Sequence, residues 1–161
     1  MQLTPEAVAA ERDWVRDRAT VVVPRINDVR DRLGAAFETQ VGTVTEPQYC
    51  AEVDEVFADG DVAVNAAALV ALLRDLDVVD DWPGFVVDEF LGRELASLIA
   101  GGQPLSLLAE ATFHVADIHT HHDDAPAGVD DLDAALAAGF QTRLPGWSWT
   151  ESESPFGVPP E

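Results

Sequence analysis

The chain has no lysine, only one cysteine and no long uninterrupted apolar run, and each absence excludes something. A single cysteine, Cys50, cannot form a disulfide within the chain. Because no stretch of about 18 consecutive apolar residues occurs, the sequence predicts no membrane-spanning helix. The first residues lack the basic and apolar segments of a secretory signal peptide. We therefore expect a cytoplasmic protein.

The motifs of the common enzyme sites are also missing. The chain contains no Gly-x-Gly-x-x-Gly or Gly-x-x-x-x-Gly-Lys loop for phosphates and no Gly-x-Ser-x-Gly nucleophile elbow. It has neither a Cys-x-x-Cys pair nor a His-Glu-x-x-His helix, the stronger signals of a metal site. These absences favour a non-enzymatic protein that binds other proteins, in an assembly, adaptor or regulatory role.

The missing lysine accompanies a large excess of acid. Against 30 Asp and Glu the chain has nine basic residues, all arginine, for a formal charge of −21 over 161 residues. Such a surface repels nucleic acid, because phosphate binding depends on Lys and Arg. Dense carboxylates keep a protein dispersed in molar salt, which screens their mutual repulsion. The composition is therefore typical of a haloarchaeal cytoplasm, with high K⁺ or Na⁺ as the solvent requirement.

The charge is unevenly distributed along the chain. Residues 1–38 hold seven acids and six arginines, a net charge of −1, so residues 39–161 carry the remaining −20. The near-neutral segment also has apolar residues at helical spacing, namely Val15, Val22, Ile26, Val29 and Leu33. One interpretation is a helix that packs in the core while its arginines pair with acids of its own and of neighbouring helices. The other is a surface that binds a partner or a second copy in a homodimer.

Apolar periodicity predicts an all-α single-domain bundle of six or seven helices. Thr4 and Pro5 mark the start of a long N-terminal helix, and Pro24 is expected to kink or split it near Val22 and Val23. Further helices are predicted over residues 46–60, 61–76, 85–99 and 104–120, with a short one opening at Asp130 or Asp131 and ending near Gly139. Only residues 41–45 have a strand-like composition. The bundle is expected to span residues 1–144, followed by an extended tail of residues 145–161.

The tail combines Pro, Gly and Ser with large aromatic rings. Trp147, Trp149 and Phe156 stand out, because a tail without aromatic residues would simply be disordered. One interpretation is that the rings pack back on the bundle. The alternative is a peptide-like motif that binds in a groove of another chain.

One cluster of residues has the chemistry of a metal site. Glu110, His114, Asp117 and His121 fall on one face of a helix at the spacing i, i+4, i+7, i+11. Imidazole and carboxylate are good ligands for Zn, Fe, Ni or Mn, so a metal-binding bundle or metalloenzyme is the first alternative function. The structural alternative is that these polar residues form only the solvent-facing edge of the helix.

A second alternative function uses acids alone. Glu52 and Glu55, with Asp77 and Asp80, have the spacing of paired Mg²⁺-binding carboxylates on facing helices, as in all-α nucleotide phosphohydrolases. Such pairs arise easily by chance in a chain this acidic. The segments that carry them also bring no basic residue for a phosphate.

Overall fold

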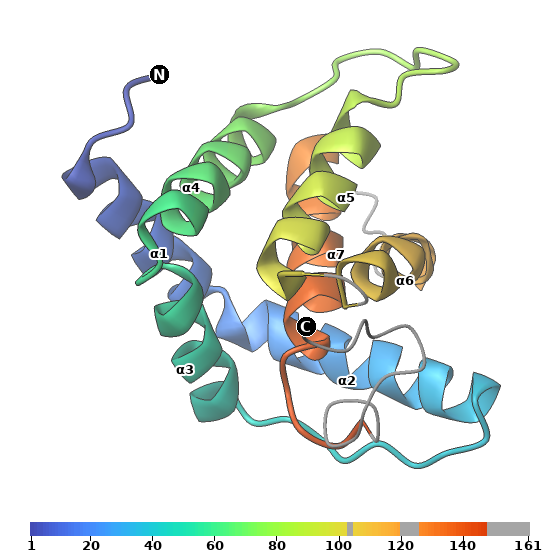
Figure 1. Ribbon diagram of the computed structural model, residues 1–161. Coiled ribbons are helices and arrows are strands. Elements are labelled where there is room, and N and C mark those ends of the chain that lie inside the picture. Colours follow the sequence, from blue (N-terminus) through green and yellow to red (C-terminus); the bar gives the residue numbers. More distant parts are fainter. Residues whose placement is uncertain (103–104, 120–125, 148–161) are drawn as a thin grey trace, which may run out of the picture.

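The chain folds into a single all-α bundle, which confirms the predicted fold class. The computed structural model describes residues 1–102, 105–119 and 126–147, and within these ranges it forms seven α-helices and no strand (Figure 1). The helices are α1 (Pro5–Asp17), α2 (Ala19–Ala36), α3 (Glu46–Val56), α4 (Gly60–Asp75), α5 (Val87–Ala100), α6 (Leu105–His119) and α7 (Ala127–Gln141). No single helix in these ranges is long and apolar enough to cross a membrane; only α3 and α4 taken together meet that test, and they are bent by 113°.

Helix α7 is the centre of the bundle. It packs against α5, α6, α2 and α4, and Figure 1 shows it running behind α5. Thirteen of its fifteen residues are buried. Its small side chains allow this, because a Cβ on Gly128 would lie 2.0 Å from the Leu73 carbonyl oxygen and one on Gly139 would lie 2.9 Å from Ile99 Cβ. The sequence predicted a shorter helix here, with Asp130 or Asp131 as its cap. Both residues lie instead inside the helix and are buried.

The N-terminal helix begins where it was predicted to begin but breaks at a different residue. The Thr4 side chain accepts a hydrogen bond from the Ala7 amide (3.1 Å), and Pro5 occupies the first turn. The break falls at Arg18, between α1 and α2, and Pro24 lies inside α2. Pro24 cannot donate to the Thr20 carbonyl, but both residues are exposed, so water can hydrate that oxygen. The predicted split at Val22 and Val23 is wrong, because α2 continues through both residues.

The strand-like segment, residues 41–45, runs as an extended connection between α2 and α3. The side chain of Asn27 bonds Val44 as a neighbouring strand would, because its Oδ1 accepts from the Val44 amide (2.7 Å) and its Nδ2 donates to the Val44 carbonyl (3.1 Å). Thr45 then caps α3 in a reciprocal capping box with Gln48. The β-branched residues thus belong to an extended loop that is hydrogen-bonded to α2.

Candidate functional site

The apolar seam of the first quarter lies in the protein's own core. Val15, Val22, Ile26, Val29 and Leu33 are at most 8% exposed. The arginines around them pair with acids, as in Arg16 with Asp54 on α3 and Arg32 with Asp28 one turn away in α2 (3.0 Å). A side chain buried in its own chain is not free to contact another one. The structure therefore follows the core-packing interpretation of this segment.

Two of those arginines reach a carboxylate in the centre of the bundle. Arg18 donates two hydrogen bonds to Asp133 of α7 (2.8 and 2.7 Å), and Arg25 Nη1 lies 3.5 Å from the same carboxylate. Asp133 is almost fully buried, and a buried carboxylate is tolerated when a guanidinium binds both of its oxygens. This ion pair joins the start of α2 to α7 and has a structural role.

Asp131, two residues earlier in α7, has carboxylates rather than arginines as its neighbours. Burial and the adjacent side chains of Asp117 (α6) and Asp88 (α5) raise the pKa of Asp131 to about 10. Asp131 is therefore protonated at neutral pH and can donate a hydrogen bond to one of the other two acids. The sequence signal was available, since Asp130, Asp131 and Asp133 interrupt an otherwise apolar, alanine-rich helix, but we interpreted it as a helix cap.

Three of the four proposed metal ligands on the α6 segment lie within the described residues. Glu110 and Asp117 are half-buried, His114 is exposed, and His121 lies outside the described residues. Among residues 1–102, 105–119 and 126–147, no three His, Cys, Asp or Glu side chains come together in a way that could hold a metal ion. What the described part of α6 does show is that Asp117 faces Asp131.

The acids considered for Mg²⁺ do not face one another. Glu52 binds Arg143 at 2.9 Å, and Glu55 lies 3.4 Å from the same guanidinium. Asp77 and Asp80 are exposed on the connection between α4 and α5. Arg143 thus links α3 to the end of α7 and neutralises the glutamates that a metal would need.

The first part of the tail packs on the bundle. Trp147 is buried, and its Nε1 donates to Gln141 Oε1 (2.9 Å). The Arg30 guanidinium lies 5.7 Å from the Trp147 ring and donates to the carbonyls of Gly42, Gln141 and Pro145. Burial without a carboxylate partner lowers the pKa of Arg30 to about 10. Trp149 and Phe156, the other aromatic residues of the predicted motif, lie outside the described residues.

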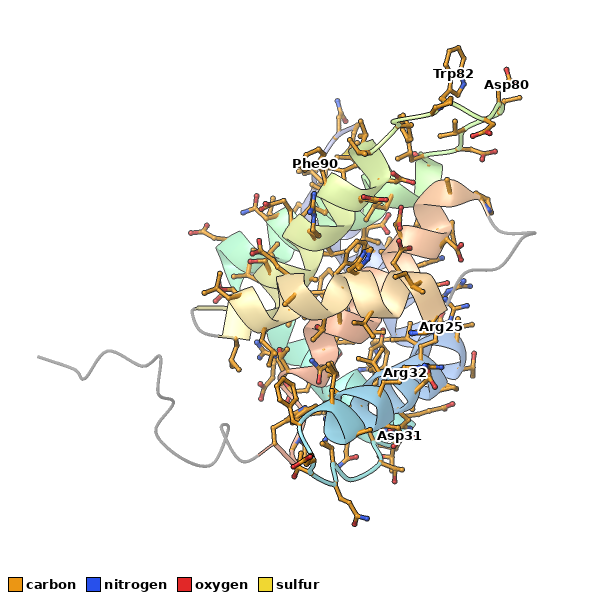
Figure 2. The ribbon with its side chains drawn as sticks, turned by 90° about the vertical axis from the view of Figure 1, so that its right-hand side faces the viewer. Arg25, Asp31, Arg32, Asp80, Trp82 and Phe90 are labelled. Carbon is orange, nitrogen blue, oxygen red and sulfur yellow. The ribbon has the colours of Figure 1, made fainter. Side chains whose placement is uncertain are left out.

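The most unusual surface of the described residues follows α4. Six of their thirteen large exposed hydrophobic side chains fall within residues 79–90. We call this set the α4–α5 surface; it consists of Val79, Trp82, Phe85, Val86, Val87 and Phe90. Trp82 is 63% exposed and Phe90 57% exposed. Figure 2 shows Trp82 projecting from the connection before α5, with Phe90 on the same end of the bundle.

Sequence reasoning missed this surface, because it assigned Phe85, Val86 and Phe90 to a helix over residues 85–99. The structure starts α5 only at Val87 and leaves all three exposed. A signal was present, because Pro83 and Gly84 mark a turn, and the apolar residues on either side of a turn need not belong to a helix.

A groove between α5 and α6 continues this surface. It encloses about 480 Å³ and is lined by Phe90, Arg93 and Glu94 of α5 and by Leu107, Glu110 and Ala111 of α6. Arg93 lies over the Phe90 ring at 4.9 Å, and Leu107 is 52% exposed. The groove therefore combines apolar surface with charged side chains of both signs.

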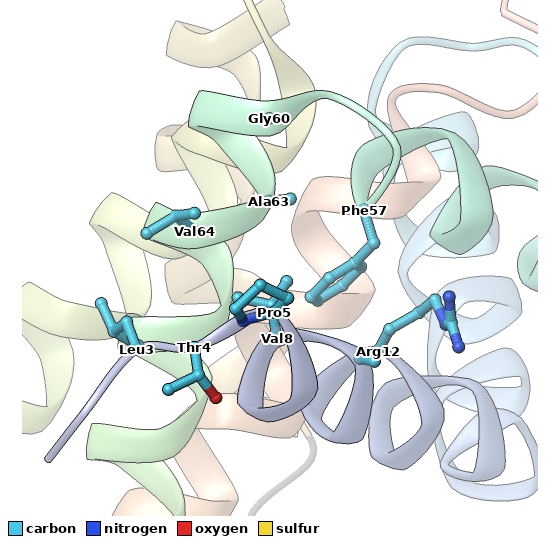
Figure 3. Close-up of a pocket in the computed structure, with 10 residues that line it drawn as sticks. Leu3, Thr4, Pro5, Val8, Arg12, Phe57, Gly60, Ala63 and Val64 are labelled. Atoms are coloured by element: carbon cyan, nitrogen blue, oxygen red, sulfur yellow. The ribbon is translucent and has the colours of Figure 1, made fainter.

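A second, more apolar groove lies on another side of the bundle, where α1 meets the start of α4 (Figure 3). It encloses about 380 Å³, and Phe57 reaches toward Pro5 and Val8 within it. Arg12 is its one charged lining residue and is already paired with Asp13 at 3.0 Å. Nothing in this groove indicates a particular ligand.

Comparison with known proteins identifies a family. The family described as "Domain of unknown function (DUF7984)" matches residues 1–160, so the chain belongs to this family over nearly its whole length. No curated protein and no solved structure matches the chain. The family description names no activity.

Proposed function

We propose that this member of a family of unknown function is a protein-binding helical protein of a high-salt cytoplasm. Its partner contacts the α4–α5 surface. The single observation that carries the proposal is the concentration of six exposed apolar side chains within residues 79–90 of a chain that is otherwise rich in surface acid. Exposed apolar side chains gathered in one segment are typical of interaction sites in proteins.

The composition of the surface supports a protein partner. Tryptophan and other aromatic residues are enriched among the residues that dominate binding energy, and Trp82 projects far enough to enter a pocket of a partner. Molar salt strengthens this argument, since salting-out ions favour the burial of apolar surface. An apolar contact retains its strength where the salt screens surface charge.

The acids around this surface favour a partner other than a second copy. Segment 75–90 contains Asp75, Asp77, Asp80, Asp81, Asp88 and Glu89 and no basic residue. A symmetric dimer would bring the same acids face to face, and like charges that meet at an interface disfavour binding. A partner with an apolar centre and a basic rim complements the surface in both respects.

The proposal is tested by site-specific photo-crosslinking. A benzophenone amino acid replaces Trp82 in one version of the protein and Asp31, exposed on α2, in the control version. Both are incubated with extract of the source cells in molar KCl. We expect one discrete crosslinked protein at position 82 that is absent at position 31.

The captured protein is then purified, and its affinity for the unmodified chain and for Trp82→Ser is measured. A loss of roughly 30-fold is expected, because truncating an aromatic anchor costs about 2 kcal/mol or more. Equal crosslinking at positions 82 and 31, or an unchanged affinity, would contradict the proposal.

A further inference from the structure

Exposed side chains recur at helical spacing along the solvent-facing side of α6. Leu107, Ala111, His114 and Ile118 are all exposed and are spaced i, i+4, i+7, i+11. Residues at this spacing form one face of a helix. Leu107 and Ala111 line the α5–α6 groove, and Ile118, which is 57% exposed, lies further along the same helix. Three apolar side chains, with His114 among them, thus face solvent beside the groove.

The shape of this face suits a third helix. Two packed helices leave a groove between them, and a further helix can bind there with its own apolar side chains inserted. Phe90 lines the α5–α6 groove from α5, and Leu107 and Ala111 line it from α6. Among the described residues, only those of α5 and α6 line the groove.

The charged side chains at the groove indicate which kind of helix would bind there. Glu94 and Glu110 line it, and Asp80 and Asp81 lie on the connection that leads into α5. The positive charge of Arg93, the only arginine that lines the groove, is directed to the face of the Phe90 ring. The lining of the groove therefore has one more acid than base, and the complementary occupant has basic side chains beside its apolar stripe.

Two occupants that this chain could itself supply fit poorly. Residues 148–161 contain Glu151, Glu153 and Glu161 and no basic residue, so their charge repels that of the groove. A second copy of the chain carries −21 and no lysine. Of its arginines on α1 and α2, Arg30 is buried, and others already pair with acids of their own chain, as Arg12 does with Asp13 and Arg32 with Asp28. Charge complementarity therefore favours a different protein.

We infer that the partner inserts a basic amphipathic helix into the α5–α6 groove, with its apolar stripe against Phe90 and Leu107. This inference rests on the proposed function, and it specifies the chemistry of the partner. The α4–α5 surface then extends the same contact beyond the end of the groove, where Trp82 projects.

The test uses model peptides with the full-length chain. One is an 18-residue peptide of Leu and Lys with a single apolar face, and its control has the same composition in scrambled order. Binding of each labelled peptide is followed by fluorescence anisotropy in about 1 M KCl, where the Debye length is only about 3 Å and unspecific attraction of positive charge is screened. We expect the amphipathic peptide to bind at least about tenfold more tightly than the scrambled one.

Matched variants locate the binding site. Phe90→Ser and Leu107→Ser remove side chains that are more than half exposed, so folding, checked by circular dichroism, should be retained. Each is expected to weaken binding of the amphipathic peptide by roughly 5- to 30-fold. The control Val64→Ser removes an apolar side chain that is 41% exposed beside the other groove and should change binding less than about twofold. Equal binding of the two peptides, or equal losses for Val64→Ser and Phe90→Ser, would overturn the inference.

The inference and the proposed function fail separately. If Trp82→Ser abolishes binding of the crosslinked partner while Phe90→Ser and Leu107→Ser leave it intact, the groove is not the site and the protein-binding function stands. If position 82 captures no protein, the proposed function itself fails.

Discussion

At the scale of single residues, Asp131 and Asp133 show how neighbouring groups give one residue type two opposite roles. Both are buried in α7, two positions apart. Asp133 has the guanidinium of Arg18 against it and is the anion of an ion pair. Asp131 has the carboxyls of Asp88 and Asp117 against it and holds a proton. Replacing each by asparagine should therefore change the stability of the protein in opposite directions.

The first prediction concerns pH. The pKa of Asp131 is raised from 3.8 to about 10 in the folded protein, so between these values the folded state holds one more proton than the unfolded chain. The free energy of unfolding should then fall as the pH rises through this window, by up to about 1.4 kcal/mol per pH unit for one group. We expect Asp131→Asn to have a shallower pH dependence and to be more stable than wild type at pH 9. Denaturant unfolding between pH 6 and 9 at constant salt measures this, and identical slopes for the two proteins would contradict it.

The second prediction concerns the ion pair. Asp133→Asn leaves the Arg18 guanidinium, and Arg25 beside it, without their acid in a largely buried place. Removing one partner of a buried pair costs about 3 kcal/mol or more. The same unfolding measurements at neutral pH should show a loss of this size. A variant as stable as wild type would mean that water or another acid replaces Asp133.

At the scale of helices, the sequence predicted best where a local signal sets the structure. Thr4 with Pro5 marked the start of α1, and the predicted end of the helix over residues 85–99 lies one residue before the end of α5, which Gly101 follows with φ of +95°. Asp130 and Asp131 misled the prediction, because an acid before an apolar run usually caps a helix. Asp131 is buried against Asp117 and Asp88, which come from α6 and α5. No local pattern reveals such tertiary partners.

The interior position of α7 gives the third prediction. A Cβ on Gly128 would lie 2.0 and 2.5 Å from the carbonyl oxygens of Leu73 and Leu76, which are backbone atoms near the end of α4. Gly128→Ala should therefore push α7 away from α4 and cost about 1–3 kcal/mol of stability. In the control, Gly60→Ala, the new methyl group meets nothing within 4 Å, and alanine favours the helix by about 0.4–1 kcal/mol. Thermal unfolding of both variants checks this, and equal melting temperatures would contradict it.

At the scale of the whole molecule, most of the acids behind the charge of −21 face solvent, and Asp130, Asp131 and Asp133 are buried exceptions. Most of the arginines bind acids: Arg143 bonds Glu52, Arg74 bonds Glu11, and Arg18 bonds Asp133. The near-neutral first quarter is thus explained by pairing within the chain. The surface that we propose for a partner lies elsewhere, where residues 79–90 expose apolar side chains among acids.

The fourth prediction follows from the excess of acidic over basic residues in the chain, 30 against nine. The mutual repulsion of the acids destabilises the folded state at low salt and is screened at high salt. Raising KCl from 0.1 to 3 M should increase the free energy of unfolding by a few kcal/mol and the melting temperature by roughly 10 °C. Differential scanning fluorimetry in a KCl series tests this. A melting temperature that is independent of salt would contradict the proposed adaptation to a high-salt cytoplasm.

The size of the protein in native extract tests the central claim most directly. The purified chain should behave as a monomer of 17.3 kDa in molar KCl, whereas in extract of the source cells it should elute in a larger complex. A Trp82→Ser, Phe90→Ser double variant should elute from the same extract at the monomer position. A wild-type chain that elutes at 17.3 kDa in extract, or a double variant that stays in the larger complex, would contradict a protein-binding function of this surface.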